Sequence, residues 1–173
     1  MNGVRMCLLA LLLGSCGSFV AEPQHQFDDR EAQRRAMSEI RSTGAAMLSW
    51  LTDRLSEAPH HPANTVLIAD NGQPPIDWRR CPTISLIELH HELVPRYLNW
   101  IPDRDPWGKP YDFCLERESF DGRVVLGIRT SGRNHTFETD VYTIGPFDPT
   151  DFDQDVVWID GSFVRWPQEF PVL

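Results

Sequence analysis

The sequence predicts a single α+β domain, in which a long N-terminal helix, a short second helix and a small antiparallel β-sheet share one core. Apolar residues recur at steps of three and four over residues 30–57, as on one face of an amphipathic helix. After residue 101 the period shortens to that of strands, and turn residues separate the apolar runs. A length of 173 residues and a hydrophobic content of 41% fit one globular domain.

The long helix is predicted over residues 30–57, where Asp28 or Asp29 can cap the N-terminus by accepting hydrogen bonds from free backbone amides. Pro59 and Pro62 end it. Most charged residues of the segment fall off the apolar face, so we expect this face to pack on the sheet. The apolar face comprises Ala32, Ala36, Ile40, Gly44, Met47, Leu48, Leu51 and Leu55.

A short strand is predicted at residues 65–69, followed by a second helix that begins near residue 83. Ser85 and Glu88 have the spacing of a capping box, in which side chains and backbone amides satisfy each other at a helix start. Pro95 ends or interrupts this helix, because proline lacks the amide hydrogen that a helix interior needs.

Two hairpins are predicted in the C-terminal half. Asp160-Gly161 marks the turn of the second one, since this dipeptide favours the tight turns that join antiparallel strands. Residues 131–155 lie between the hairpins and are rich in Asp, Thr, Gly and Pro. They are predicted to form a long ordered loop, a type of segment that often carries function. The expected strands are 111–116 with 124–130, and 156–159 with 162–166.

The N-terminus has the features of an export signal. Arg5 precedes a short apolar run at residues 6–13, which is too short to span a membrane. Residues 13–16 (LGSC) resemble the lipobox of bacterial lipoproteins, in which the cysteine receives a diacylglyceryl group and becomes the new N-terminus. The alternative is ordinary cleavage at a nearby small residue, which leaves Cys16 as a free thiol.

The lipobox resemblance implies an organisation for the whole chain. Residues 1–15 would be a lipoprotein signal peptide, 16–27 a tether lipidated at Cys16, and 28–173 the folded periplasmic domain. Gly17 stands where a sorting aspartate can follow the lipidated cysteine. By resemblance to sorting in Gram-negative bacteria, this implies the periplasmic face of the outer membrane, with acyl chains such as palmitate as the anchor.

Cys81 and Cys114 remain as a pair in the exported domain. Oxidising compartments favour disulfides, and we therefore predict a bond between Cys81 and Cys114. The alternative is two buried free thiols, because the sequence alone does not tell how far apart the two residues lie.

The most specific string in the chain is DPWGKPY, at residues 105–111. Its two prolines fix φ, Gly108 permits a conformation that other residues avoid, and Trp107 and Tyr111 can anchor the turn in the core. The string resembles the DPWGNPY-type motif of the major pseudopilin of type II secretion, protein G. The flanking segments agree in order from about residue 34 to 166. The resemblance implies a pseudopilin-like fold in which this motif is structural.

The resemblance also implies a calcium site, because the protein G domain binds one Ca²⁺ between its two C-terminal loops. By this resemblance Asn134 takes the place of an aspartate ligand, and Ser131 lies near a position that offers a backbone carbonyl. Asp151, Asp153 and Asp155 supply clustered carboxylates, which calcium prefers. The family's Asp-Gly is Asn-His here, so one charge and one glycine are missing, and we expect a weak or lost site. The alternative is a solvated acidic loop.

The chain has 16 basic against 25 acidic side chains, which argues against nucleic-acid binding. No nucleophile–base pair of an enzyme can be named from the sequence. The resemblance therefore implies a non-enzymatic envelope lipoprotein with a structural or assembly role in protein secretion or a pilus-type machine, and with the proteins of that machine as partners. The alternative is an envelope-anchored ligand- or metal-binding module unrelated to secretion.

Overall fold

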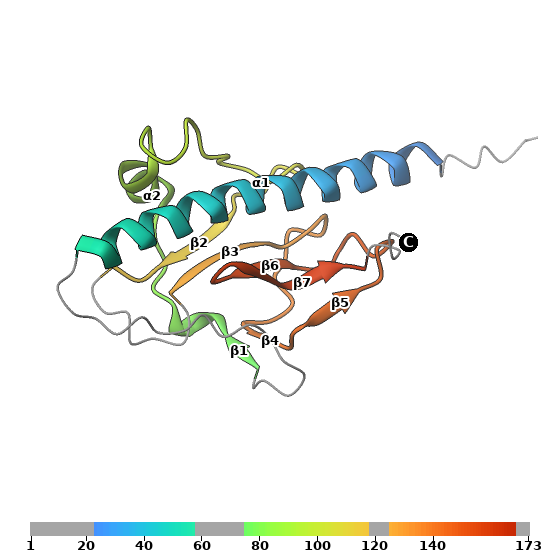
Figure 1. Cartoon of the computed structure of the whole chain (residues 1–173). Coiled ribbons are helices and arrows are strands. Elements are labelled where there is room, and N and C mark those ends of the chain that lie inside the picture. The colour runs from blue at the N-terminus through green and yellow to red at the C-terminus, as the bar shows by residue number, and fades with distance from the viewer. Residues whose placement is uncertain (1–22, 58–74, 118–124, 169–173) are drawn as a thin grey trace, which may run out of the picture.

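The computed structural model describes residues 23–57, 75–117 and 125–168, which form an α+β domain as predicted (Figure 1). The strand predicted at 65–69 lies outside these residues. No helix among them is long and apolar enough to cross a membrane. The elements, in chain order, are α1 (Pro23–Glu57), β1 (Ile76–Asp77), the 3-10 helix η1 (Trp78–Arg80), α2 (Leu86–Leu93), β2 (Asp112–Leu115), β3 (Leu126–Thr130), β4 (Val141–Tyr142), β5 (Gly145–Phe147), β6 (Val156–Ile159) and β7 (Ser162–Pro167).

Helix α1 lies along one face of the main sheet (Figure 1). Ala36 and Ile40, from the predicted apolar face, are buried, which confirms that this face packs on the sheet. Trp50 is also buried, although the sequence did not predict it. The helix lies close to the sheet at Gly44, where a β-carbon would be 2.7 Å from the ring of Trp158. The absence of a side chain at Gly44 therefore allows the helix backbone to rest on that ring.

Helix α1 begins earlier than predicted, at Pro23. Asp28 and Asp29 consequently lie within the helix, and the prediction that one of them caps it was wrong. Proline suits the first turn of a helix, because the amide hydrogen that it lacks would have no partner there. Asp29 instead accepts a hydrogen bond from the indole of Trp107, at 3.1 Å.

The main sheet has five strands in the order β2-β3-β6-β7-β5. The antiparallel pairs β2–β3 and β6–β7 confirm the predicted strand pairings, and β3 joins them by pairing antiparallel with β6. Strand β5 pairs parallel with β7, so the prediction of a purely antiparallel sheet was wrong at this edge. Both β4 and β5 lie in residues 131–155, which we predicted as loop. Strands of two or three residues are too short to produce a recognisable alternation.

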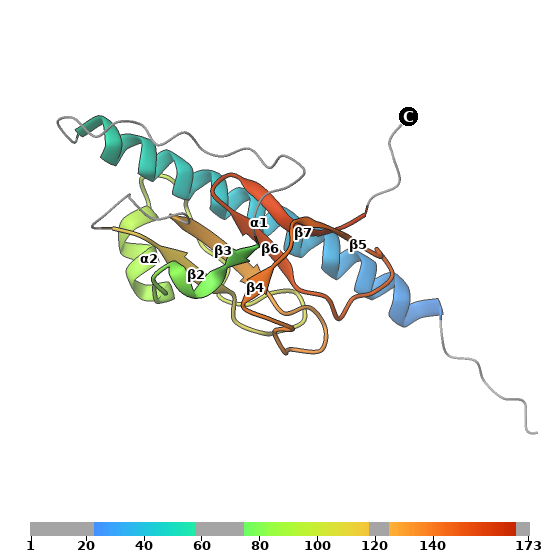
Figure 2. The same cartoon turned by 90° about the horizontal axis from the view of Figure 1, so that it is seen from below.

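Both faces of the main sheet are buried at its inner strands β3 and β6. Side chains alternate along β6, so Val156 and Trp158 belong to the core shared with α1, whereas Val157 and Ile159 pack on the opposite side. There the short antiparallel sheet β1-β4 and η1 cover them, on the side away from α1 (Figure 2). Cover on both faces explains why β6 is apolar at all four positions instead of alternating with polar residues.

The predicted disulfide links this covering segment to the main sheet. Cys81 follows η1 and Cys114 lies in β2, with 5.6 Å between their Cα atoms. Gly127 of β3 lies against the bond, since a β-carbon there would be 2.7 Å from Cys114 Sγ and 2.8 Å from the ring of Trp78. The structure thus confirms the cysteine pair and shows that Gly127 makes room for it.

Helix α2 packs beside the second half of α1 (Figure 1). Its start confirms the predicted capping box. Ser85 Oγ accepts from the amide of Glu88 at 3.3 Å, and the Glu88 carboxylate accepts from the amide of Ser85 at 3.1 Å. The helix ends shortly before Pro95, as predicted. Trp50 Nε1 of α1 donates to Glu92 of α2 at 2.9 Å and joins the two helices.

Gly127→Ala is expected to lower the free energy of unfolding of the oxidised protein by roughly 1–3 kcal/mol, because the added methyl group overpacks the space beside the disulfide. Gly145→Ala is the matched control, since a β-carbon at Gly145 meets nothing within 4 Å. Urea denaturation of both variants measures the difference. Equal stability of Gly127→Ala and the wild type would contradict this packing.

Candidate metal site

Residues 105–111 form a turn that is stabilised by the carboxylate of its first residue, Asp105. Asp105 is 4% exposed and accepts hydrogen bonds from two backbone amides of the turn, at 2.8 and 3.0 Å, and from the hydroxyl of Thr130. Gly108 has a φ of 93°, a conformation that favours glycine. This turn therefore serves the fold, as its sequence predicted, although the sequence did not single out Asp105.

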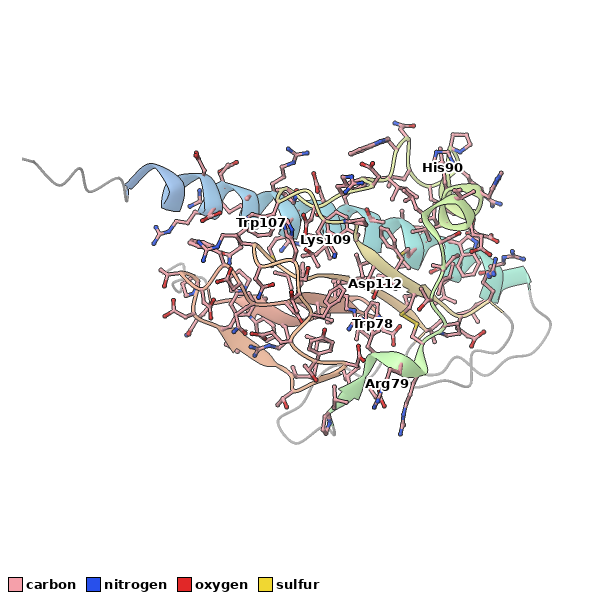
Figure 3. All side chains as sticks on the ribbon, turned by 180° about the vertical axis from the view of Figure 1, so that it is seen from behind. Trp78, Arg79, His90, Trp107, Lys109 and Asp112 are labelled. Atoms are coloured by element: carbon pink, nitrogen blue, oxygen red, sulfur yellow. A yellow bond between two sulfur atoms is a disulfide. The ribbon has the colours of Figure 1, made fainter. Side chains whose placement is uncertain are left out.

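Two side chains attach the turn to α1. The hydroxyl of buried Tyr111 donates to Glu39 Oε2 at 2.7 Å, and Trp107 Nε1 donates to Asp29 Oδ1 at 3.1 Å. Figure 3 shows Trp107 beside α1. The two aromatic residues that we predicted as anchors thus hold the turn against the helix.

The structure brings together the two segments that carry the predicted calcium ligands, because one follows β3 and the other precedes the neighbouring strand β6. Their backbones meet where the amide of Arg133 donates to the carbonyl of Phe152 at 2.8 Å. Gly132 permits this approach, since a β-carbon there would lie 2.5 Å from the same carbonyl oxygen. The predicted ligands are Ser131 and Asn134 in the first segment, and Asp151, Asp153 and Asp155 in the second.

Of these five side chains, all but that of Ser131 already have hydrogen-bond partners. Both carboxylate oxygens of Asp153 accept hydrogen bonds from the guanidinium of Arg133, each at 3.0 Å. Asn134 Nδ2 donates to the backbone carbonyl of Asp153 at 2.9 Å, and Asn134 Oδ1 accepts from an amide of its own segment at 2.8 Å. Asp151 accepts from the amide of Asp153 and from the side chain of Gln154. These hydrogen bonds therefore stabilise the turns and join the two segments.

Asp155 lies deeper than Asp151 and Asp153. It is 1% exposed, and burial raises the pKa of its carboxyl group to about 6. Its Oδ2 accepts from the hydroxyl of Tyr142 at 2.8 Å and from the amide of Glu138 at 3.1 Å. In the described part of the chain, Asp155 Oδ1 and Ser131 Oγ are buried without a hydrogen-bond partner. Both atoms lie directly beyond the last residue pair of the β3–β6 ladder.

A calcium ion takes six to eight oxygen ligands. Within residues 23–57, 75–117 and 125–168, no three His, Cys, Asp or Glu side chains are placed to hold a metal ion together. Arg133 also puts a positive charge beside Asp153. As arranged, this donor set does not fit calcium, and calcium binding stays a prediction.

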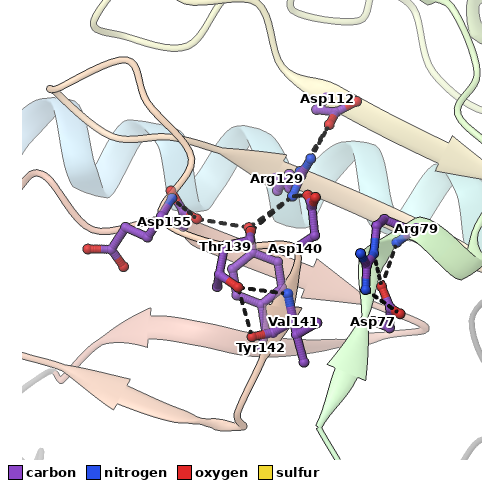
Figure 4. Close-up of polar contacts among 10 residues, drawn as sticks. Asp77, Arg79, Asp112, Arg129, Thr139, Asp140, Val141, Tyr142 and Asp155 are labelled. Atoms are coloured by element: carbon purple, nitrogen blue, oxygen red, sulfur yellow. Dashed lines mark hydrogen bonds and ion pairs between the residues drawn. The ribbon is translucent and has the colours of Figure 1, made fainter.

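A second polar cluster, around Arg129 of β3, was not predicted from the sequence (Figure 4). Arg129 is 6% exposed and forms ion pairs with Asp112 and Asp140, each at 2.9 Å. Its guanidinium also donates to the hydroxyl of Tyr142 at 3.0 Å, and that hydroxyl donates to Asp155. The phenol of Tyr142 therefore connects the buried cation to Asp155, one of the predicted ligands.

Aromatic rings complete the surroundings of Arg129. Its guanidinium carbon lies 3.9 Å from the ring centroid of Phe137 and 4.5 Å from that of Trp78. A buried cation needs such partners, because loss of its hydration is costly unless ion pairs, hydrogen bonds and ring faces replace the water. The sequence signal was a single charged residue in a largely apolar strand, but its partners lie too far along the chain to be predicted from spacing.

Tyr142→Phe is expected to lower the free energy of unfolding by about 1–3 kcal/mol, because it leaves Asp155 and Arg129 each one hydrogen bond short. Tyr97→Phe is the matched control, since the hydroxyl of Tyr97 donates to Asp53, whose side chain is 42% exposed and can gain water instead. Denaturation curves of both variants give the two losses. A loss for Tyr142→Phe no greater than that for Tyr97→Phe would count against the network.

Comparisons of the chain with protein families, with curated proteins and with solved structures find no match. Its own residues and their geometry are therefore the basis for a functional proposal.

Proposed function

We propose that the chain is a non-enzymatic, lipid-anchored envelope protein whose pseudopilin-G-like domain has a structural or assembly role in type II secretion or a pilus-type machine. The observation that carries this proposal is the order of the elements: a 35-residue helix, a short helix, the turn 105–111 and then the main sheet. The same order is implied by the motif resemblance. The hydrogen bonds of Trp107 and Tyr111 to α1 support the proposal further, because they explain why this motif occurs together with a long helix.

Helix α1 would connect the domain to the membrane. It begins seven residues after Cys16, the proposed lipid site. Its early part carries exposed charged side chains such as Arg30 and Glu31, and it extends past the sheet (Figure 1). The helix already contacts the rest of the domain at Asp29, six residues after Pro23, a distance of roughly 9 Å at about 1.5 Å per residue. A lipid at Cys16 would thus hold the folded domain away from the bilayer surface.

The proposal assigns no chemistry to the buried charged groups. The carboxylate of Asp105 closes the turn 105–111, and the guanidinium of Arg129 joins β3 to the segments that cover the sheet. Both groups have their hydrogen-bonding capacity directed at the protein itself. Partners from a secretion or pilus-type machine would therefore meet the outer surface of the domain rather than a reactive centre.

A second candidate function is an envelope-anchored ligand- or metal-binding module unrelated to secretion. Among the described residues, Ser131 Oγ and Asp155 Oδ1 are buried without a hydrogen-bond partner, and this observation favours the second candidate. Buried polar groups of this kind generally bind water, an ion or a ligand. A secretion assay separates the two candidates, because the first requires an effect on export and the second does not.

Deletion of the gene is expected to reduce the amount of type II secretion substrates in the culture medium, and the wild-type protein supplied from a plasmid should restore it. The amount of an exported protein that stays in the periplasm serves as the control for general export. Undiminished secretion in the deletion strain would contradict the role in secretion and favour the second candidate.

Cys16→Ser is expected to abolish incorporation of labelled palmitate and to release the protein from the membrane fraction or leave it unprocessed. Acyl chains hold a protein on a bilayer at about 0.8 kcal/mol per buried CH₂, so their loss removes the anchor. Cys7→Ser, within the segment that processing would remove, is the control and should keep the label. Unchanged labelling and detergent partitioning of Cys16→Ser would refute lipidation at this residue.

A further inference from the structure

We propose that the guanidinium of Arg133 takes the place of a divalent metal ion in this domain. It neutralises the acidic segment before β6 (residues 151–155) and holds this segment in position. The guanidinium binds the carboxylate of Asp153, one of the calcium ligands that the motif resemblance implies, and the side chain of Asn134, another of them, donates to the backbone carbonyl of the same residue. It also reaches α1, through an ion pair with Asp29 that joins residues 104 positions apart in the sequence. One side chain therefore connects the beginning of the domain to the segment that leads into β6.

The geometry of Arg133 is that of a bridge between two carboxylates. Its Nε and Nη2 donate to the two oxygens of Asp153, each at 3.0 Å, in the two-bonded arrangement that suits a guanidinium and a carboxylate. Its Nη1 donates to Asp29 Oδ2, also at 3.0 Å. A divalent cation between two acidic segments performs the same task, since it neutralises both charges and fixes the distance between them.

Neighbouring contacts hold both ends of this bridge. The backbone amide of Arg133 donates to the carbonyl of Phe152 at 2.8 Å, and the guanidinium carbon lies 5.8 Å from the Phe152 ring centroid. Asp29 is 15% exposed in its side chain and also accepts from Trp107 Nε1. An isolated exposed ion pair contributes little, largely because two free side chains must be ordered. Here the partners are already ordered, so more of the attraction remains.

Electrostatics and hydrogen-bond direction both disfavour a metal ion beside Arg133. The hydrogen bond from Arg133 lowers the pKa of the Asp153 carboxyl group, so this carboxylate is ionised and neutralised by the guanidinium at neutral pH. A calcium ion at the same carboxylate would meet a group of like charge at short range. Asn134 presents its Nδ2, a donor, to the Asp153 carbonyl, which leaves that oxygen occupied as well.

The first test is the response of the wild-type protein to calcium. A ligand that binds the folded state raises the midpoint of thermal unfolding, Tm, and a resident calcium ion would do so strongly. We expect the Tm values in millimolar calcium chloride and in EGTA, at matched ionic strength, to agree within about 2 °C. A larger rise with calcium would overturn the proposal.

The second test removes the guanidinium. Arg133→Gln is expected to lower Tm in EGTA by about 3–6 °C, a shift that corresponds to the loss of an ordered ion-pair network in a domain of this size. Arg79→Gln is the matched control. Arg79 makes the same two-bonded contact, at 2.8 and 3.0 Å, but with Asp77, two residues away, and its side chain is 65% exposed. A fall for Arg133→Gln no larger than for Arg79→Gln would overturn the proposal.

A double-mutant cycle then assigns the effect to the bridge. Asp153→Asn should cost the wild type several degrees but add little in the Arg133→Gln background, because the shared contact is already gone. Full additivity of the two losses would overturn the assignment of Asp153 as the partner of Arg133. If Arg133→Gln does not fold, the wild-type calcium measurement decides the question by itself.

Discussion

The fold depends on the close contact between α1 and the main sheet at Gly44. A helix position without a side chain lets the backbone rest on the ring of Trp158 in β6, the middle strand of the sheet. This contact lets α1 lie close along one face of the sheet (Figure 1). The early part of the helix then lies where Trp107 and Arg133 both reach Asp29. The turn 105–111 and the acidic segment before β6 are therefore positioned by the same packing.

The sheet face that points away from α1 is also buried, and there the charge of Arg129 must be neutralised. The covering segment, held by the disulfide of Cys81 and Cys114, brings Trp78 over β3 and takes Arg129 out of water. The cost of desolvating that cation explains the convergence of two carboxylates, a phenol and two rings on it. The phenol of Tyr142 continues the network to the segment before β6. The main sheet is thus covered by apolar packing against α1 on one face, and on the other face by a segment that also buries the paired cation Arg129.

Local patterns predicted the parts of the fold that depend on neighbours in the sequence. The helical stripe, the capping box at Ser85 and the strand pairing around the Asp160-Gly161 turn all come from periods or short spacings, and the structure confirms them. The extra helical turns before residue 30 and the short strands β4 and β5 were missed, because they carry no recognisable period. Tertiary contacts decide these elements, and a single sequence does not display such contacts.

The predicted ligand segments came together as expected, and their side chains have protein partners that the sequence did not indicate. Carboxylates clustered in sequence suggested a shared metal, whereas Asp153 pairs with Arg133 and Asp155 with Tyr142, each from a distant segment. Arg133 lies between Ser131 and Asn134, two of the predicted ligands, but its position in the sequence does not show that it faces the acidic segment. Charge neutralisation was predictable, but the choice between a metal ion and a guanidinium depends on three-dimensional arrangement.

Native-state hydrogen exchange of α1 and β6 tests the central claim most directly. If the contact at Gly44 unites helix and sheet, amides of α1 around Ala36 to Trp50 and amides of β6 should exchange with the same opening free energy, that of global unfolding. Exchange of these helix amides through a much smaller opening, while β6 stays protected, would contradict the account, because α1 would then fold and unfold independently of the sheet.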